Sequence, residues 1–134
     1  YRDWFEKAAH DLRGAEILME HDGGNDLVAF HCQQAVEKTL KGWLLKVTNE
    51  LLEGHSLVFL CRKAISAGAP LKEKLRDCAY VNQFYIETRY PADIPDEITR
   101  DLAEDILAAT EDMMEFICDC IKFDYNSYHK RNKK

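Results

Sequence analysis

Apolar residues recur at intervals of three and four along most of this chain, and that spacing constrains the fold more than any other feature. In residues 2–21, for example, Trp4, Ala8, Leu12 and Ala15 fall on one side of a helix. Only 6 Gly and 3 Pro residues occur among the 134 positions, and long stretches contain neither, which favours helix. No segment shows a strand pattern of any weight. The sequence therefore predicts an all-α protein.

Five predicted helices are separated by residues that end helices or turn the chain. Asp22-Gly23-Gly24-Asn25 follows the first helix, Gly68-Ala69-Pro70 follows the third, and Pro91 and Pro95 bracket a loop before the fifth. The predicted helices cover residues 2–21, 26–48, 55–68, 71–88 and 96–123. Short connections between long amphipathic helices predict an up-and-down bundle, with residues 1–124 as one domain and residues 125–134 as a basic, flexible tail.

The composition narrows the class of protein further. The formal charge of −6 argues against a protein that coats nucleic acid, although a small basic site within an acidic body is still compatible with it. The five cysteines are an odd number in helical settings, which favours reduced thiols in a cytoplasm over a disulfide framework. No apolar run approaches the ~18 residues that a membrane span needs. We therefore expect a cytoplasmic protein without a metal or cofactor.

The second predicted helix carries an unusual polar edge. At 100° per residue, His31, Gln34, Lys38 and Lys41 fall within an arc of roughly 80°, and Glu37 borders it. Two ammonium groups, an imidazole and an amide on one edge are able to hold a phosphate or a base. The alternative is a solvated face on which Glu37 and Lys41 form an ordinary helical ion pair.

A second polar group lies near the end of the fourth predicted helix. Asn82, Tyr85 and Arg89 recur at helical spacing, and Tyr90-Pro91 then turns the chain away. A guanidinium in the last helical turn suits the helix dipole and is able to clamp a phosphate through two hydrogen bonds. The alternative is that Arg89 only anchors the following loop through backbone carbonyls.

His55 follows Gly54 and opens the third predicted helix, where it either caps or packs the helix or takes part in a site. The sequence lacks the residue patterns that several other catalytic or binding mechanisms need. The chain has no Glu-x-x-His pair for a di-iron centre, no Gly-rich phosphate loop and no Gly-x-Ser-x-Gly nucleophile elbow.

Taken together, these segments resemble one known family, the HEPN domain (higher eukaryote and prokaryote nucleotide-binding). The resemblance covers about residues 2–122 and includes the opening Trp4…Ala8…Asp11-Leu12…Ala15. Its main segments are Asp26-x-x-x-Phe30-His31-Cys32-Gln33-Gln34-Ala35-Val36-Glu37-Lys38-x-Leu40-Lys41, His55-Ser56-Leu57-x-x-Leu60 and Asn82-x-x-Tyr85-x-x-x-Arg89-Tyr90-Pro91. Each segment alone is weak, but their order and spacing together are specific.

The resemblance implies a bundle of four long helices with a shorter one, often paired as a homodimer. Phe84, Ile86, Tyr90 and Phe123 are apolar residues in excess of what one small bundle hides, and a shared interface would cover them. The family also implies a frequent neighbour, a minimal nucleotidyltransferase, in a two-component or toxin–antitoxin pair. Its RNase members carry an Arg followed after four to six residues by a His, where the cation steadies the phosphate and the imidazole moves protons.

This chain departs from the RNase pattern, because no His follows Arg89 or any other arginine at that spacing. What remains resembles the Arg-Tyr-Pro subgroup, and it predicts a non-catalytic nucleotide- or RNA-associated partner module. The phosphate candidates are Lys38, Lys41 and Arg89, the base or orientation candidates are His31, Gln34, Tyr85 and Tyr90, and the supporting candidates are Glu37, His55, Asn82 and Pro91. Two alternatives stay open: a metal-independent RNase with His31 or His55 as proton carrier, and a purely structural dimeric adaptor.

Overall fold

Every regular element in the computed structural model is helical, over the residues 1–84 and 98–122 that the structure describes. The elements are α1 (Arg2–Glu20), α2 (Asn25–Thr48), α3 (Leu57–Ser66), the 3-10 helix η1 (Lys72–Lys74), α4 (Leu75–Asn82) and α5 (Arg100–Cys120). The predicted all-α bundle is confirmed. None of the described helices is both long and apolar enough to span a lipid bilayer.

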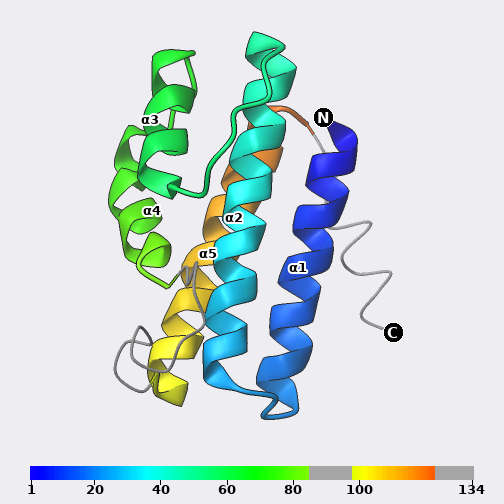
Figure 1. Ribbon diagram of the computed structural model, residues 1–134, viewed down its shortest axis with the longest axis vertical. Coiled ribbons are helices and arrows are strands. Elements are labelled where there is room, and N and C mark those ends of the chain that lie inside the picture. The colour runs from blue at the N-terminus through cyan, green and yellow to red at the C-terminus, as the bar shows by residue number, and fades with distance from the viewer. Residues whose placement is uncertain (85–97, 123–134) are drawn as a thin grey trace.

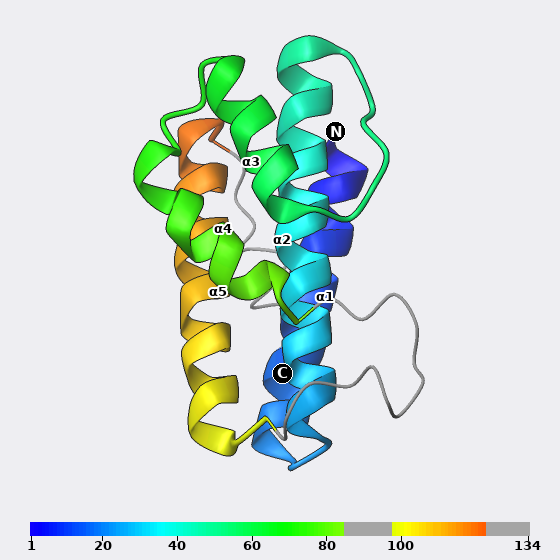
Figure 2. The ribbon, with the colours of Figure 1, turned by 60° about the vertical axis from the view of Figure 1, so that its left-hand side comes forward.

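Helix α2 lies at the centre of the bundle and contacts each of the other four α-helices. Helix α1 runs antiparallel to α2 on one side, and α5 packs along α2 from behind in the view of Figure 1. The connection of residues 49–56 returns along α2, and the short pair α3 and α4 then covers the side of α2 away from α1 (Figure 2). Polar side chains of α2 can therefore reach either α1 or the start of α3.

The contact between α1 and α2 is close because small residues line it. Ala8, Ala9 and Ala15 are completely buried. A methyl group added at Gly42 would lie 3.0 Å from Cβ of Trp4 and 3.1 Å from the Phe5 ring, so this position needs glycine to keep the helices at their observed separation.

Four of the five cysteines belong to the core, and all five are free thiols. Cys32, Cys61, Cys78 and Cys118 are at most 1% exposed, whereas Cys120 is exposed. Burial raises the pKa of the Cys32 and Cys118 thiols to about 12. The Cys78 thiol donates to Sδ of Met113 at 3.7 Å and so links α4 to α5. Cys32 and Cys118 are therefore structural, neutral groups at ordinary pH.

The boundaries of three helices differ from the prediction. Helix α5 covers Arg100–Cys120 rather than residues 96–123, because the hydroxyl of Thr99 accepts a hydrogen bond from the amide of Leu102 and caps the helix. The third helix begins at Leu57 rather than at His55, because the hydroxyl of Ser56 accepts a hydrogen bond from the amide of Phe59 and caps it. Helix α4 follows a short 3-10 turn and ends at Asn82, and the predicted continuation over residues 85–88 lies outside the described residues.

The apolar surplus expected near the fourth helix is smaller than predicted. Phe84 is only 7% exposed and packs edge-on against Tyr80, so it belongs to this bundle and not to a shared surface. Ile86, Tyr90 and Phe123 lie outside the described residues.

Candidate functional site

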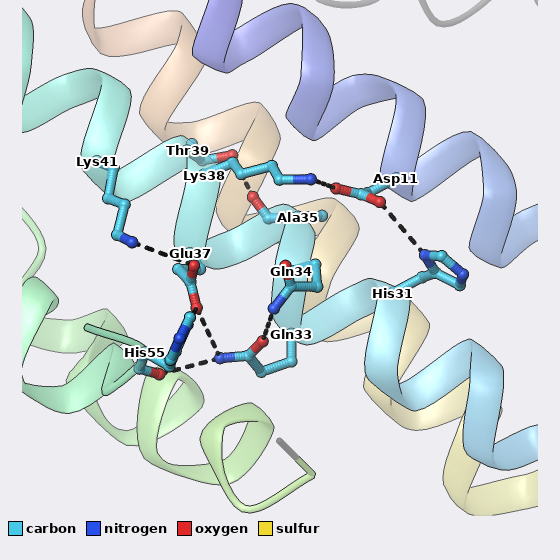
Figure 3. A network of polar contacts seen from close by, with 10 residues as sticks. All are labelled: Asp11, His31, Gln33, Gln34, Ala35, Glu37, Lys38, Thr39, Lys41 and His55. Atoms are coloured by element: carbon cyan, nitrogen blue, oxygen red, sulfur yellow. Dashed lines mark hydrogen bonds and ion pairs between the residues drawn. The ribbon is translucent and has the colours of Figure 1, made fainter. Parts of the chain in front are cut away.

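Glu37, in the middle of α2, is the centre of a buried polar network (Figure 3). Its side chain is 5% exposed, and its carboxylate lies 3.3 Å from Nζ of Lys41 and 3.0 Å from Nδ1 of His55. The Gln33 amide also donates to this carboxylate at 3.4 Å. A buried carboxylate is costly unless it is both paired and hydrogen-bonded, and here three side chains meet that need.

Gln33 joins this network to the connection that precedes α3. Its side chain is completely buried, its Nε2 donates to the backbone carbonyl of His55 at 3.0 Å, and its Oε1 accepts from the Gln34 amide at 2.8 Å. His55 is therefore held by α2 through both its ring and its carbonyl. The sequence reasoning selected Gln34 for base recognition but missed Gln33. The one available signal was the spacing of four residues between Gln33 and Glu37.

Lys41 is buried, with a side chain that is 9% exposed, and its ammonium has two favourable neighbours. Besides the Glu37 carboxylate, the indole of Trp4 lies 5.9 Å from Nζ, measured to the ring centroid. The helical ion pair that the sequence offered as an alternative is thus present, but it is buried and does not lie on a solvated face. Among the described residues, every buried side-chain nitrogen and oxygen has a hydrogen-bond partner, so this network is fully satisfied there.

Asp11 of α1 is the centre of a second, more exposed cluster. One carboxylate oxygen lies 3.3 Å from Nδ1 of His31, and the other accepts a hydrogen bond from the ammonium of Lys38 (Figure 3). The side chains of His31 and Lys38 are 36% and 25% exposed. Asp11 is separated from them by 20 and 27 residues in sequence, and no local spacing pointed to it as their partner.

The edge predicted on α2 is therefore divided between two polar clusters, although Lys41 also lies beside Trp4 of α1. His31 and Lys38 reach α1 through Asp11, while Gln34 and Lys41 contact the network around Glu37 (Figure 3).

Asn82 holds the beginning of α3. Its side-chain oxygen accepts from the amide of Leu57 at 2.8 Å, so the last residue of α4 satisfies a free N–H group at the first residue of α3. Tyr85, Arg89, Tyr90 and Pro91, which the sequence placed beside it, lie outside the described residues.

A cleft of about 430 Å³ opens next to the Asp11 cluster. Its lining residues are Asp3, Trp4 and Lys7 of α1 and Lys38 of α2. The cleft therefore combines one aromatic surface, two ammonium groups and one carboxylate. Only Lys38 among these residues was a candidate from the sequence. No group of three or more metal-ligating side chains is present in the described parts of the chain.

The HEPN domain profile matches residues 1–121, and the chain belongs to the HEPN domain family. Among solved structures, TT1696 from Thermus thermophilus is 29% identical with a TM-score of 0.72, and the alignment covers 88% of this chain and 95% of that one. ST0689, described as an archaeal HEPN homologue, has the same fold at 24% identity and a TM-score of 0.70, covering 90% of this chain and 96% of the other. No curated protein matches the sequence. The family expected from the sequence is thus confirmed.

Proposed function

We propose that this HEPN domain binds a nucleotide, free or within RNA, through its phosphate, and that it acts without turnover as the partner of a second protein. The proposed partner is a minimal nucleotidyltransferase in a two-component or toxin–antitoxin pair, and the proposed working form is a homodimer. Both follow from what the family resemblance implies. The observation that carries the binding proposal is the Asp11 cluster.

That cluster holds a cation and an imidazole at the protein surface in a fixed orientation. The Asp11 carboxylate occupies one of the three donors on the Lys38 ammonium, which leaves donors for a second anion. His31 contacts the same carboxylate from α2 and keeps about a third of its side chain exposed. Phosphate oxygens are acceptors that suit both groups. We also propose that Arg89 binds the phosphate through two hydrogen bonds, and this assignment rests on its sequence position alone.

The roles proposed for the other candidates differ with their surroundings. Lys41 is buried and paired, so it adds positive charge and orients Glu37 while Lys38 contacts the ligand. Gln34 donates to Gln33, while Asn82 and His55 hold the beginning of α3 on the opposite side of α2 and support the bundle rather than contacting the ligand. Tyr85 and Tyr90 remain candidates for base contacts, and Pro91 remains a supporting candidate, on the basis of the sequence alone.

Calorimetric titration with AMP and ATP tests this proposal. Arg89→Ala should weaken binding by on the order of 1.5–3 kcal/mol, or roughly ten- to a hundred-fold, because a charge-assisted contact is lost. Lys38→Gln should weaken it less, because a partly exposed point charge is screened by salt. Lys72→Gln, an exposed lysine on η1, is the matched control and should bind like wild type. Wild-type affinity in folded Arg89→Ala and Lys38→Gln would overturn the proposed site.

One observation favours a second function, that of a metal-independent RNase. The Glu37 carboxylate holds Nδ1 of His55 at 3.0 Å while the imidazole side chain is 48% exposed. A carboxylate-oriented imidazole of this kind is suited to proton transfer at its other nitrogen. RNA cleavage in EDTA that disappears in His55→Ala and persists in His10→Ala, an exposed histidine, would establish the RNase function. Uncut RNA is the result that the binding proposal expects. A third function, a structural adaptor, would bind no nucleotide and cleave no RNA.

A further inference from the structure

The cleft lined by Asp3, Trp4, Lys7 and Lys38 has the chemistry of a site for a complete nucleoside phosphate. We propose that a base of the ligand stacks on the indole of Trp4 while its phosphate binds between Lys7 and Lys38. This inference rests on the proposed function, since it names where the base of that same ligand lies. The volume of about 430 Å³ is within the range of roughly 300–1,000 Å³ that small-molecule sites occupy.

The position of Trp4 is set by the packing of α1 on α2. Because Gly42 has no side chain, the Cβ of Trp4 sits directly against the α2 backbone. The next residue, Phe5, is 1% exposed and belongs to the core, whereas Trp4 stays partly exposed and lines the cleft. Trp43, the other tryptophan of the chain, is 6% exposed within the core. An indole fixed in this way at a cleft is a preformed surface for an aromatic base.

The charged groups of the cleft match the remaining parts of a nucleotide. Asp3, Lys7 and Asp11 are spaced by four residues, so they follow one edge of α1. Lys38 is already paired with Asp11, but Lys7 has no ion-pair partner among the described residues. A phosphate at Lys7 would therefore add an attractive interaction without having to displace a carboxylate from that lysine. Asp3 supplies an acceptor for a ribose hydroxyl or a base amino group.

Trp4 fluorescence gives a direct test. In Trp43→Phe, Trp4 is the only tryptophan, so any change in emission reports on the cleft. AMP, and separately a short oligouridylate, should quench that emission with the midpoint found by calorimetry. If AMP quenches the Trp4 emission to saturation, a free nucleotide is enough to fill the cleft. If only the oligonucleotide quenches it, the base and phosphate that bind there belong to RNA.

Substitutions then separate the base contact from the phosphate contact. Trp4→Leu should weaken AMP binding roughly 5- to 100-fold, the effect of one base–aromatic stack, and Trp4→Phe should restore most of it. Ribose 5-phosphate, which has no base, should bind wild type and Trp4→Leu equally. Lys7→Gln should weaken AMP and ribose 5-phosphate alike, with Lys72→Gln as the control. Melting temperatures confirm that each variant is folded.

The outcomes distinguish the cleft from the function on which it rests. If AMP or the oligonucleotide binds wild type by calorimetry, but Trp4 emission does not change and Trp4→Leu binds equally well, the cleft is not the base site and the proposed function stands. If neither ligand binds wild type at millimolar concentration, the proposed function and the cleft fail together.

Discussion

The carboxylate of Glu37 lies 3.0 Å from the imidazole of His55, across 18 residues of sequence, and on its other side it pairs with the Lys41 ammonium at 3.3 Å. The same carboxylate thus stabilises a buried lysine within its own helix and holds the connection that leads to α3. The stability of the bundle and the position of the exposed imidazole depend on one side chain.

Glu37→Gln should therefore lower the free energy of unfolding by about 3 kcal/mol, because it leaves the Lys41 ammonium buried without a counter-charge. Urea unfolding measures this. The double variant Glu37→Gln/Lys41→Met should recover part of the loss, since no buried charge remains. Glu115→Gln, an exposed glutamate on α5, is the control. A loss below about 0.5 kcal/mol, as at ordinary surface sites, would mean that the pair is not effectively buried.

Replacing two helical glycines by alanine should change the stability of the protein in opposite directions. Gly42→Ala should destabilise the protein by about 1–3 kcal/mol, because the added methyl would meet Trp4 and Phe5 at 3.0–3.1 Å. Gly14→Ala should stabilise it by about 0.5–1 kcal/mol, because nothing lies within 4 Å and alanine favours helix. Thermal and urea unfolding of the two variants check this. Equal stability of the Gly42→Ala and Gly14→Ala variants would contradict the close contact between α1 and α2.

Cysteine reactivity should follow burial. At pH 8 the exposed Cys120 should alkylate quickly in the folded protein, whereas Cys32 and Cys118 should not. Raising a thiol pKa from 9.0 to about 12 reduces its thiolate fraction about a thousandfold, in addition to the steric protection. Peptide mapping after iodoacetamide treatment, with a denatured sample as control, identifies the modified residues. Rapid alkylation of Cys32 in the native state would contradict its place in the core.

Alkaline pH should weaken the fold through the same thiols. The pKa values of Cys32 and Cys118 are raised from 9.0 in the unfolded chain to about 12 in the folded protein. The stabilising contribution of these two buried thiols is therefore fully present below pH 9.0 and is lost as the pH rises towards 12, because only the unfolded chain ionises easily in that range. By pH 10 each thiol should cost about 1 kcal/mol of unfolding free energy. Urea unfolding at pH 8 and pH 10 measures the difference. Cys118→Ala should reduce the loss, and Cys120→Ala should leave it unchanged; equal losses in the two variants would refute the assignment.

Much of the fold was predictable because the first two helices carry their own start and end signals. The bounds predicted for α1 and α2 agree with the structure within one residue. The beginning of α3 was not predicted correctly, since both His55 and Ser56 were able to precede a helix. The choice between them depends on Glu37, which draws the His55 ring away from the helix end and leaves Ser56 as the cap.

The candidate site was predictable only where its contacts are local. The Glu37–Lys41 pair could be read from a spacing of four residues, and it is present. The role of Asp11 could not be read in the same way, because helix periodicity says which residues share a face but not which face of another helix they meet. The lining role of Trp4 and Lys7 was missed for the same reason, as Trp4 was assigned to the apolar stripe of α1.

The bridge from Asp11 to His31 and Lys38 has a consequence for which anions the surface can select. Because the Asp11 carboxylate already neutralises the charge of Lys38 while leaving donors on it, a monovalent anion such as chloride gains little by binding beside this pair, whereas a doubly charged terminal phosphate gains more. The internal carboxylate thus sets a minimum charge for an anion that binds here. Asp11 belongs to α1 while His31 and Lys38 belong to α2, so a ligand that contacts Lys38 meets a group that ties two helices together. Selectivity for charge and the attachment of the first helix would then be coupled.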